Sequence, residues 1–438
     1  MSLASALFFV FVAHNVIAQT SKPASNSANF CPPKTTQQLP FPYFRGLYLG
    51  WVGHYNTGDE ALFQIIQEQF VRSGLELSVG VSLYPFSPSA NCKQVLIDVR
   101  SNGAYDFIIL GGGTILTDDK YHCELSAAQA ANIPVFVAGS GMNPSTSLYF
   151  GETFQYEAED QLKWIERFGR TGSTGYGGVR GLWSMNVVQH FFPLTKLKVL
   201  GDAGMLMSSQ WDRPTFVPYT IRDNWVAVGY GWTLTNGKTA DDIYHQNMDE
   251  ALDIAFAQFV SDLMIEGVHD VVLYAMDPAS HEASWKLSVR VMEYMKTKHI
   301  ETNVSKLYLI PQILDSYSLA SLFTHSKVTV NYKLHGSILS AAVGTPFVAA
   351  AYHSKSWDFV SDLEGYPNEL TIETQAIEKD PKLLLSAFSQ VVEPKNFAML
   401  KRVLKAAKEK ITLRWNFEVS DFLQVLKMKN SKKMDKLI

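Results

Sequence analysis

Two side chains in the later part of the chain have the types and the spacing to act on an anion. Lys333 and His335 stand two residues apart in the stretch 331–355, NYKLHGSILSAAVGTPFVAAAYHSK, at the mouth of an apolar run rich in small residues. We expect a buried strand over Lys327–Tyr332 that runs on through Leu334, and alternation along it would put both side chains on one face. A lone histidine is commonly structural. Beside a cation, at the carboxyl end of a strand, a catalytic role has the same weight as a structural one, because the imidazole can give or take a proton near neutral pH.

A helix over Gly336–Val343 is expected directly after this strand. The first amides of a helix have no partner within it, so those at Gly336 and Ser337 are available to an anion. The next strand, Pro346–Ala351, is followed by Tyr-His-Ser-Lys, and its lysine, Lys355, supplies a second cation. The stretch as a whole predicts a site for a small substrate with two anionic groups.

A glycine-rich turn near the start of the chain is the second candidate. The stretch 50–61, GWVGHYNTGDEA, follows an expected strand and opens a helix over Asp59–Ser73, which Asp59 would cap and Gly74 would end. Backbone amides at such a turn can approach an anion or a sugar closely. The glycines could equally serve only to turn the backbone. The residues that we assign here to acceptor binding or to the wall of the site are Gly53, Asn56, Gly58 and Asp59.

Further glycine turns follow the next expected strands, and parallel strands present such turns at one edge of a sheet. In the stretch 105–119, YDFIILGGGTILTDD, a strand at Asp106–Leu110 is followed by Gly111, Gly112, Gly113 and Thr114, which we place in the same wall. Arg180 precedes an expected helix and could be a cation for a carboxylate or a phosphate. Triple glycines and surface arginines are also common without a function.

The elements that must position these residues alternate between short apolar runs and amphipathic stretches, which is typical of βα units and a mostly parallel sheet. This pattern predicts an α/β protein with two doubly wound domains that face a cleft, followed by C-terminal helices. The predicted strands are Arg45–Gly50, Leu75–Leu83, Asp106–Leu110, Pro134–Ala138, Leu197–Leu200, Trp225–Gly229, Asp270–Ala275, Lys306–Ile310, Lys327–Tyr332 and Pro346–Ala351. The predicted helices after the first are Met248–Ile265, Glu282–Met295, Ser316–Phe323, Gly336–Val343 and most of Pro394–Lys427. The domains are expected at 41–210 and 224–392, joined by the linker Ser208–Asp223, with a helical segment and basic tail at 393–438.

Composition narrows the class of function. The chain has 438 residues, 18% of them charged, and a formal net charge of −4. A nucleic-acid-binding protein needs a concentrated basic face, so we expect no nucleic-acid partner. The three cysteines form no CxxC pair, so we expect no zinc site, and the sequence does not choose which two would form a disulfide.

The start of the chain predicts a route into the secretory pathway, to the lumen of the endoplasmic reticulum or Golgi or outside the cell. Residues 1–18 contain a short apolar core and small residues before a cleavage position, which is typical of a signal peptide. An uncleaved anchor is the alternative, with residues 19–40 as a polar linker, and membrane association would then depend on residues 1–18 alone. Asn303 begins an N-glycosylation sequon, which has meaning only if the chain enters that pathway.

Taken in order, these segments resemble the polysaccharide pyruvyl transferase family. The resemblance covers about 46–355 and begins with the Gly-Asp-Glu-Ala turn at 58–61. The triple glycine, the next glycine turn, the segment with Arg180 and the Gly-Asp pair at 201–202 follow. It ends with Lys333-Leu334-His335, then Gly-Thr-Pro at 344–346 and the Tyr-x-x-Lys that ends at Lys355.

The resemblance implies a two-domain fold like that of the GT-B glycosyltransferases. It also implies transfer of the pyruvyl unit of phosphoenolpyruvate to sugar hydroxyls of a glycan, with a ketal formed and phosphate released. His335 and Arg180 would then be catalytic, and His335 would be the general acid. Donor binding would involve Lys333, Gly336, Ser337 and Lys355. Phosphoenolpyruvate would be a co-substrate, and no further cofactor or metal is implied.

The sequence departs from the family pattern at three places. Lys333 stands where the family usually has arginine, which keeps the charge but loses the planar, two-pronged contact with a carboxylate. The usual Arg-Asp pair reads Arg180-Gly181, and the usual Asp-Pro-Ala reads Asp-Ala-Gly at 202–204. These departures leave two alternatives open: a glycosyltransferase that uses a nucleotide-sugar on the same scaffold, and a non-catalytic glycan-binding descendant.

Overall fold

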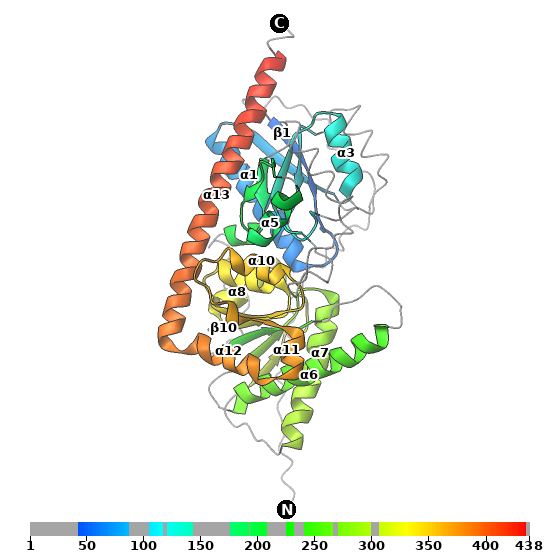
Figure 1. Ribbon diagram of the computed structural model, residues 1–438, viewed down its shortest axis with the longest axis vertical. Coiled ribbons are helices and arrows are strands. Elements are labelled where there is room, and N and C mark those ends of the chain that lie inside the picture. Colours follow the sequence, from blue (N-terminus) through cyan, green and yellow to red (C-terminus); the bar gives the residue numbers. More distant parts are fainter. Residues whose placement is uncertain are drawn as a thin grey trace, which may run out of the picture. The chain divides into compact units, whose positions relative to one another are not determined.

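Two parallel β-sheets organise the chain (Figure 1). The computed structural model describes residues 43–86, 105–116, 121–142, 176–191, 193–207, 225–231, 241–265, 270–298 and 306–434, all of which belong to one compact unit, Leu39–Ile438. The first sheet has the order β2-β1-β3-β4-β5-β6 and the second β12-β11-β10-β7-β8-β9. The first sheet consists of β1 (Tyr43–Leu49), β2 (Gly80–Phe86), β3 (Phe107–Leu110), β4 (Val135–Ser140), β5 (Tyr176–Val179) and β6 (Lys198–Val199). The second consists of β7 (Val226–Gly229), β8 (Val271–Tyr274), β9 (Leu307–Leu309), β10 (Val328–Asn331), β11 (Phe347–Ala351) and β12 (Thr371–Glu373).

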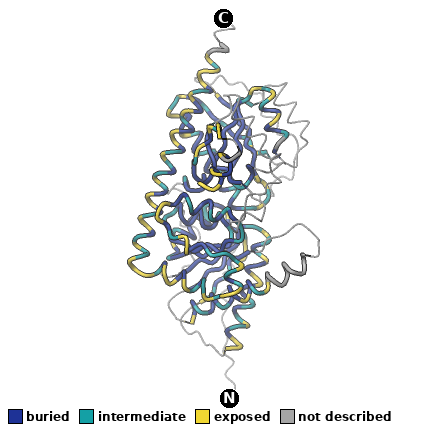
Figure 2. The backbone as a smooth tube through the Cα atoms, viewed as in Figure 1, coloured by how far each residue is buried: buried dark blue, intermediate teal, exposed yellow. Residues whose placement is uncertain are grey.

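The central strands are continuous apolar runs because helices cover both faces of each sheet. β3 has the sequence FIIL, β7 VAVG and β8 VVLY, and every residue in them is buried. Figure 2 shows the strands of both sheets in the colour of buried residues, with exposed residues on the surrounding helices. The core therefore lies on the two sheets.

Both strand orders contain a point where the direction of winding reverses. In the first sheet β1 lies between β2 and β3, and in the second sheet β7 lies between β8 and β10. Doubly wound sheets bind ligands at the carboxyl ends of the strands beside such a point. The glycine turns after β1 and β3, and Lys333 and His335 after β10, all follow strands at these two points. The topology therefore brings most of the predicted site residues to the positions where this kind of fold binds ligands.

The helices largely follow the predicted rhythm. Those of the first half are α1 (Thr57–Glu76), α3 (His122–Ala130), α5 (Leu182–Phe191) and the 3₁₀ helix η3 (Ala203–Leu206). Those of the second half are α6 (Asp241–Ile265), α7 (Pro278–Thr297), α8 (Ser316–His325), α9 (Leu334–Ala342), α10 (Lys355–Ser361), η5 (Asn368–Leu370), α11 (Thr374–Lys379) and α12 (Lys382–Val392).

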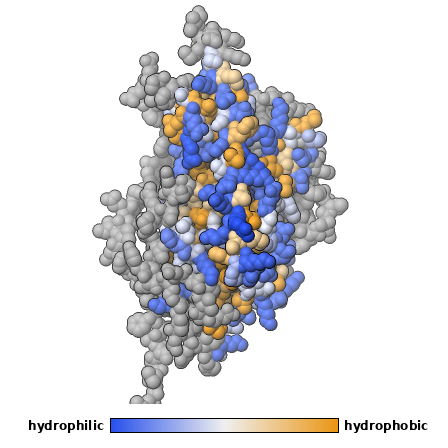
Figure 3. All heavy atoms as spheres, turned by 90° about the vertical axis from the view of Figure 1, so that its left-hand side faces the viewer, coloured by the Kyte–Doolittle hydropathy of each residue, from blue (hydrophilic) through white to orange (hydrophobic). Residues whose placement is uncertain are grey.

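The final helix, α13 (Pro394–Met434), connects the two halves of the described unit (Figure 1). It packs against α12 and α9 of the second half and against α1, β5 and η3 of the first. Trp415 is fully buried and donates from its indole nitrogen to the carbonyl of Gly201 at 3.3 Å. Figure 3 looks onto the side where α13 lies and shows hydrophobic residues dispersed among hydrophilic ones. The predicted C-terminal helical segment is thus present, with one face buried along its length.

Three details of the predicted elements were wrong. Asn56, not Asp59, caps α1, because its side chain accepts from the amide of Gly58 and Asp59 lies inside the first turn. α1 runs through Gly74 to Glu76, since helix packing outweighs the intrinsic cost of one glycine. The strand expected from Leu75 begins only at Gly80. The sequence patterns also did not reveal β5, β12, α3, α10, α11 or α12, most of which are short.

Several predictions fall outside the described residues: the signal peptide or anchor at 1–18, the linkers at 19–40 and 208–223, the sequon and two of the cysteines. Cys123 is disulfide-bonded, and its partner lies outside the described residues. Within the described ranges, no helix is both long and apolar enough to span a membrane. The domain boundaries at 41–210 and 224–392 stay predictions.

Candidate active site

His335 lies in the first turn of α9 and not on a strand, which corrects the expected alternation. β10 ends at Asn331, and Lys333 is the N-cap of α9, with φ −81° and ψ 135°. The two side chains therefore do not share the face of a strand. Lys333 forms an ion pair with Asp277 at 3.2 Å, whereas the ring of His335 packs against Gly58 at the start of α1.

A hydrogen-bonded network beneath α9 fixes the position of this turn. The hydroxyl of Tyr274 donates to Asn331 at 2.6 Å, and Asn331 donates to Thr329 at 2.8 Å. A side chain at Gly336 would lie 2.7 Å from the Tyr274 hydroxyl, so only glycine fits there. The amide of Gly336 already donates to the carbonyl of Lys333 at 3.0 Å. Gly336 therefore serves the packing of the turn, and its predicted part in donor binding gains no support from this geometry.

The first turn of α1 meets the first turn of α9. A Cβ at Gly58 would lie 2.1 Å from Nδ1 of His335, so the ring rests on bare backbone. Thr57 binds the second half directly, with its amide on the carbonyl of Met276 at 2.9 Å and its hydroxyl on the carbonyl of Leu314 at 2.7 Å. Two helix N-termini, each with a partial positive charge, thus meet at His335.

His335 has an unpaired nitrogen in a strongly positive environment. Its Nε2 atom is buried and has no hydrogen-bond partner among the described residues. Burial, and then the charges of Arg180, Lys355 and Lys333, lower the pKa of His335 from 6.5 to about 3. The imidazole is therefore neutral at physiological pH in the ligand-free protein. The hydroxyl of Ser337, two residues further along the first turn of α9, is also buried and has no partner among the described residues.

Two of the cations lie against an aromatic ring. The ammonium of Lys355 lies 4.7 Å from the centroid of Tyr352, and that of Lys333 lies 5.8 Å from it. Tyr352 in turn stacks on Tyr332, with centroids 4.6 Å apart and an angle of 11° between the rings. Burial raises the pKa of the Tyr352 phenol, but the two lysines outweigh it and hold the pKa below its ordinary value.

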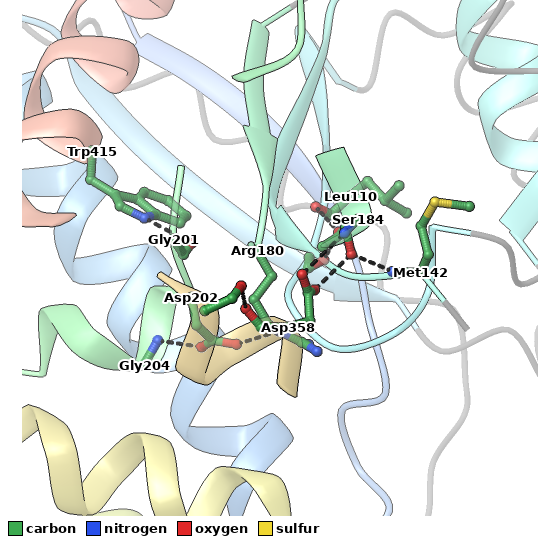
Figure 4. Close-up of polar contacts among 12 residues, drawn as sticks. Leu110, Met142, Arg180, Ser184, Gly201, Asp202, Gly204, Asp358 and Trp415 are labelled. Atoms are coloured by element: carbon green, nitrogen blue, oxygen red, sulfur yellow. Dashed lines mark hydrogen bonds and ion pairs between the residues drawn. The ribbon is translucent and has the colours of Figure 1, made fainter. Parts of the chain in front are cut away.

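Arg180, the third cation, is fully buried after β5 (Figure 4). Its Nε donates to Asp202 at 2.8 Å, and Asp202 also caps η3 by accepting from the amide of Gly204 at 2.8 Å. Both terminal nitrogens of the guanidinium, Nη1 and Nη2, have no partner among the described residues. A buried guanidinium with four unused N–H bonds is unusual and points to an anionic group that completes the site.

Asp358, from α10 of the second half, explains why residue 181 is glycine. Its carboxylate accepts from the hydroxyl of Ser184 at 2.6 Å and from the amide of Ser184 at 3.0 Å, which caps α5 from the opposite half. A Cβ at Gly181 would lie 2.0 Å from the carbonyl oxygen of Asp358 and 2.4 Å from its Oδ1. The carboxylate of Asp358 thus occupies the space beside Arg180 that a side chain at 181 would need. Figure 4 shows Asp202 and Asp358 on either side of Arg180.

The glycine turns of the first half have different roles. Side chains at Gly111 and Gly112 would overlap with Tyr48 and Leu62, so these two glycines permit close packing. Gly113 has φ +99°, and a side chain at this position would place its Cβ 3.7 Å from Oδ1 of Asp59. This turn therefore lies at the site. Thr114, the next residue, is half-buried.

Gly53 and Asn56 belong to the loop that leads into α1. Gly53 has φ +87°, and its amide donates to Oε1 of Glu60 at 2.6 Å, so the loop is tied back onto the first turn of the helix. Asn56 uses its side-chain oxygen to cap α1. Both residues therefore shape the entry to α1, and a contact with substrate remains a prediction for each.

Asp59 lies in the first turn of α1 and differs from the other acids near His335 in the partners of its carboxylate. It is partly exposed, and no described residue forms a hydrogen bond or ion pair with its carboxylate. Burial raises the pKa of Asp59 from 3.8 to about 7, although the nearby charges of Lys355 and Arg180 act in the opposite direction. The site thus contains a carboxyl group that can gain or lose a proton near neutral pH.

Sequence patterns missed two acids of the site. Asp277 could have been found, because Asp-Pro-x-Ser is a helix-start pattern, and Asp277 caps α7 through the amide of Ser280 at 2.7 Å. Asp358 gave no such signal, since only the fold brings it beside Arg180. Within the described ranges no three His, Cys, Asp or Glu side chains gather to hold a metal ion, and the expectation of a metal-free site stays a prediction.

Solved structures with a related fold have very different sequences. The UDP-GlcNAc 2-epimerase of Methanocaldococcus jannaschii matches with a TM-score of 0.52 and 9% identity, over 80% of this chain and 93% of its own. The UDP-GlcNAc 2-epimerase of Neisseria meningitidis, solved with UDP-GlcNAc bound, matches with a TM-score of 0.52 and 12% identity, over 87% and 100%. At this identity the similarity shows the fold alone, and it confirms the predicted two-domain arrangement of GT-B type.

A comparison with curated protein sequences finds no significant match. The sequence profile of the family described as polysaccharide pyruvyl transferase, however, matches residues 56–354. That range contains the second switch point, at β7, and every charged residue placed around His335 except Lys355 and Asp358, which lie shortly after it. The chain therefore belongs to the polysaccharide pyruvyl transferase family and is a transferase with a GT-B-type fold.

Proposed function

We propose that the protein transfers the pyruvyl unit of phosphoenolpyruvate to two hydroxyls of a glycan sugar, forming a ketal and releasing phosphate. The observation that supports this most directly is the convergence of three cations and two helix N-termini on His335. Phosphoenolpyruvate carries a phosphate and a carboxylate, and such an environment suits two anionic groups close together. Family membership supports the same reaction class.

In this proposal each of the three cations has a different part in binding the donor. Lys333 and Lys355 are partly exposed near the ring of Tyr352 and can meet the donor as it enters. Asp277 balances part of the charge of Lys333, so anion affinity does not depend on that lysine alone. Arg180 is buried, and its two Nη atoms, which have no partner in the described ranges, suit the deepest anionic group of the donor. The hydroxyl of Ser337 is a further unused donor at the start of α9.

His335 would act as the general acid, and its low pKa in the ligand-free protein is consistent with that role. Without the donor, three cations disfavour the imidazolium. A bound polyanion reverses that balance, so His335 gains its proton only when the donor is present. The imidazolium can then protonate the methylene carbon of the donor, which makes the central carbon electrophilic toward a sugar hydroxyl.

A nucleotide-sugar donor is the alternative. The Neisseria enzyme with the same fold was solved with UDP-GlcNAc bound, and a diphosphate would also fit a ring of cations. Pyruvyl transfer is favoured because a site for a nucleotide-sugar gives no reason for a histidine in the middle of three cations. A glycan acceptor fits both donors. A glycan-binding protein without catalysis would not need a carboxyl group and an imidazole that can exchange protons.

We also propose the secretory pathway as the location, on the basis of residues 1–18 and the sequon at Asn303. Expression in a eukaryotic host followed by N-terminal sequencing of the purified protein distinguishes a cleaved signal from an anchor. A mature chain that starts near residue 19 supports cleavage, and an intact Met1 in the membrane fraction supports the anchor. An intact Met1 in the soluble cytosolic fraction would contradict both.

Calorimetry with phosphoenolpyruvate tests the donor assignment. We expect micromolar to millimolar binding by the wild type and at least tenfold weaker binding by Lys333→Ala. Lys298→Ala is a matched control. The ammonium of Lys298 also lies 5.8 Å from the centroid of a tyrosine ring, that of Tyr294, but this pair belongs to the C-terminal end of α7. Absence of heat from phosphoenolpyruvate at millimolar concentration, together with binding of UDP-GlcNAc, would replace the proposal by the nucleotide-sugar alternative.

A further inference from the structure

The carboxylates around His335 are not equivalent. Four of them already have hydrogen-bond or ion-pair partners that explain their presence. These are Asp202 with Arg180, Asp277 with Lys333, Asp358 with Ser184, and Glu60 with the amide of Gly53.

Asp59 is the remaining acid of this group. Its carboxylate has no partner among the described residues, whereas Asp202 and Asp358 are buried and fully engaged. Asp59 follows Gly58, whose backbone touches the ring of His335, and it faces the turn at Gly113 from the first half of the site. It is partly exposed, so a ligand can reach it. A carboxylate that has no partner in the described part of the chain, beside the proposed acid catalyst, calls for a chemical role.

We propose that Asp59 is the general base that removes the proton from the attacking hydroxyl of the acceptor sugar. This inference rests on the proposed function, which assigns the donor side of the reaction to His335. Asp59 and His335 belong to the first turns of α1 and α9, so the two helices would present a base and an acid to one substrate. The acceptor would bind on the side of the site formed by the turns that precede α1 and follow β3.

The two groups can complete the reaction without any further proton carrier. In the first step the sugar hydroxyl forms a C–O bond to the central carbon of phosphoenolpyruvate, its proton passes to Asp59, and the imidazolium of His335 protonates the methylene carbon to a methyl group. In the second step the C–O bond to phosphate breaks, and Asp59 returns its proton to the leaving phosphate. The second sugar hydroxyl attacks the same carbon and gives its proton to His335. Both side chains then regain their initial protonation states.

The charges that face Asp59 agree with this role. They come from Glu60 on its own helix, Lys355 on α10, Arg180 after β5, Asp202 before η3, and the phenol of Tyr48 on β1. Burial is the largest influence and raises the pKa of Asp59 to about 7, where a carboxyl group can both accept and return a proton.

The test uses Asp59→Asn in the full-length protein, with Asp59→Glu as the conservative variant. Glu124→Gln is the matched control, because Glu124 occupies the same third position of a helix, α3, and burial also raises its pKa. Ketal formation from phosphoenolpyruvate and a panel of nitrophenyl monosaccharides is followed by NMR across pH 5 to 9. Donor affinity is measured by calorimetry on the same samples.

We expect Asp59→Asn to lower kcat by about 10²- to 10⁴-fold and to remove the acidic limb of the pH profile near pH 7. Its affinity for phosphoenolpyruvate should be unchanged or higher, because a negative charge is removed, and Asp59→Glu should recover part of kcat. A kcat within threefold of the wild type would overturn the inference, and so would loss of donor binding in parallel with kcat. If the wild type forms no ketal, the proposed function fails, and the same variants are assayed with UDP-GlcNAc, whose transfer also requires a base. Full activity of Asp59→Asn with that donor, or no turnover of either donor by the wild type, would overturn the role of Asp59 as well.

Discussion

Binding of phosphoenolpyruvate should add a proton to His335. In the ligand-free protein burial and three cations lower the pKa of His335 to about 3, so the imidazole is neutral at any pH above that. A general acid must carry a proton when the reaction starts. His335 can therefore act as the general acid only if the donor itself brings the imidazole into its protonated form.

The magnitude follows from the charges around the ring. A fall from 6.5 to about 3 corresponds to a bias of about 5 kcal/mol toward the neutral imidazole. A unit negative charge about 5 Å away contributes about 3 kcal/mol in the opposite direction at an effective dielectric constant of about 20. Phosphoenolpyruvate carries at least two such charges near neutral pH, so the donor suffices to return the pKa of His335 to its ordinary range.

Isothermal titration calorimetry measures this proton directly. Titrations at pH 6.5 in buffers with different ionisation enthalpies give the number of protons taken up for each donor bound. The phosphate of the donor also changes its ionisation on binding, so His335→Asn serves as the reference. We expect the wild type to take up about half a proton or more beyond that variant, as an imidazole of ordinary pKa would.

Equal proton uptake by the wild type and His335→Asn would refute this reasoning, provided that both bind the donor. It would mean that His335 stays neutral in the complex and cannot be the general acid. Loss of donor binding by His335→Asn would be a different failure, because it would make His335 a binding residue.

Three further predictions concern the packing and the ionisation of the site. Gly58→Ala should lower kcat at least a hundredfold and lower the free energy of unfolding in urea by about 1–3 kcal/mol, because the new Cβ would lie 2.1 Å from Nδ1 of His335. Wild-type kinetics of this variant would show that the contact is not needed. Asp59→Asn should raise Tm at pH 8 but not at pH 4. The pKa of Asp59 is about 7 in the folded protein and 3.8 in its ordinary state, so ionisation of Asp59 lowers the stability by up to about 4 kcal/mol as the pH rises. An equal gain in Tm at both pH values would contradict that folded-state pKa. Asp358→Ala should cost about 1–3 kcal/mol by leaving the amide and hydroxyl of Ser184 unpaired, and an unchanged urea midpoint would argue against the bond between the halves.

The fold was predictable where local patterns and packing agree. Buried parallel strands such as β3 and β8 are short apolar runs between turns, and their order along the chain indicated two doubly wound sheets. The exact ends of elements were less predictable. α9 begins at Leu334 because the chain leaves the sheet after Asn331, and nothing in the alternation of Lys333 and His335 marks that exit.

The site was predictable only in part, because its key contacts join residues far apart in the sequence. Lys333, His335 and Arg180 could be selected by type and position. The partnership of Ser184 with Asp358 spans 174 residues and depends on both halves being folded. Gly181 illustrates the difference: in the sequence it is a departure from the family pattern, whereas in the structure the carboxylate of Asp358 fills the space beside it.

The most direct test of the central claim is the reaction itself in deuterated water. The wild type is incubated with phosphoenolpyruvate and the panel of nitrophenyl sugars, and the product is examined by proton and carbon NMR. We expect a pyruvyl ketal whose methyl group carries one deuterium, delivered by His335, with an equivalent of phosphate released and no product from His335→Ala. A ketal formed equally well by His335→Ala, or a folded wild-type protein that binds phosphoenolpyruvate and forms no ketal with any sugar, would contradict it.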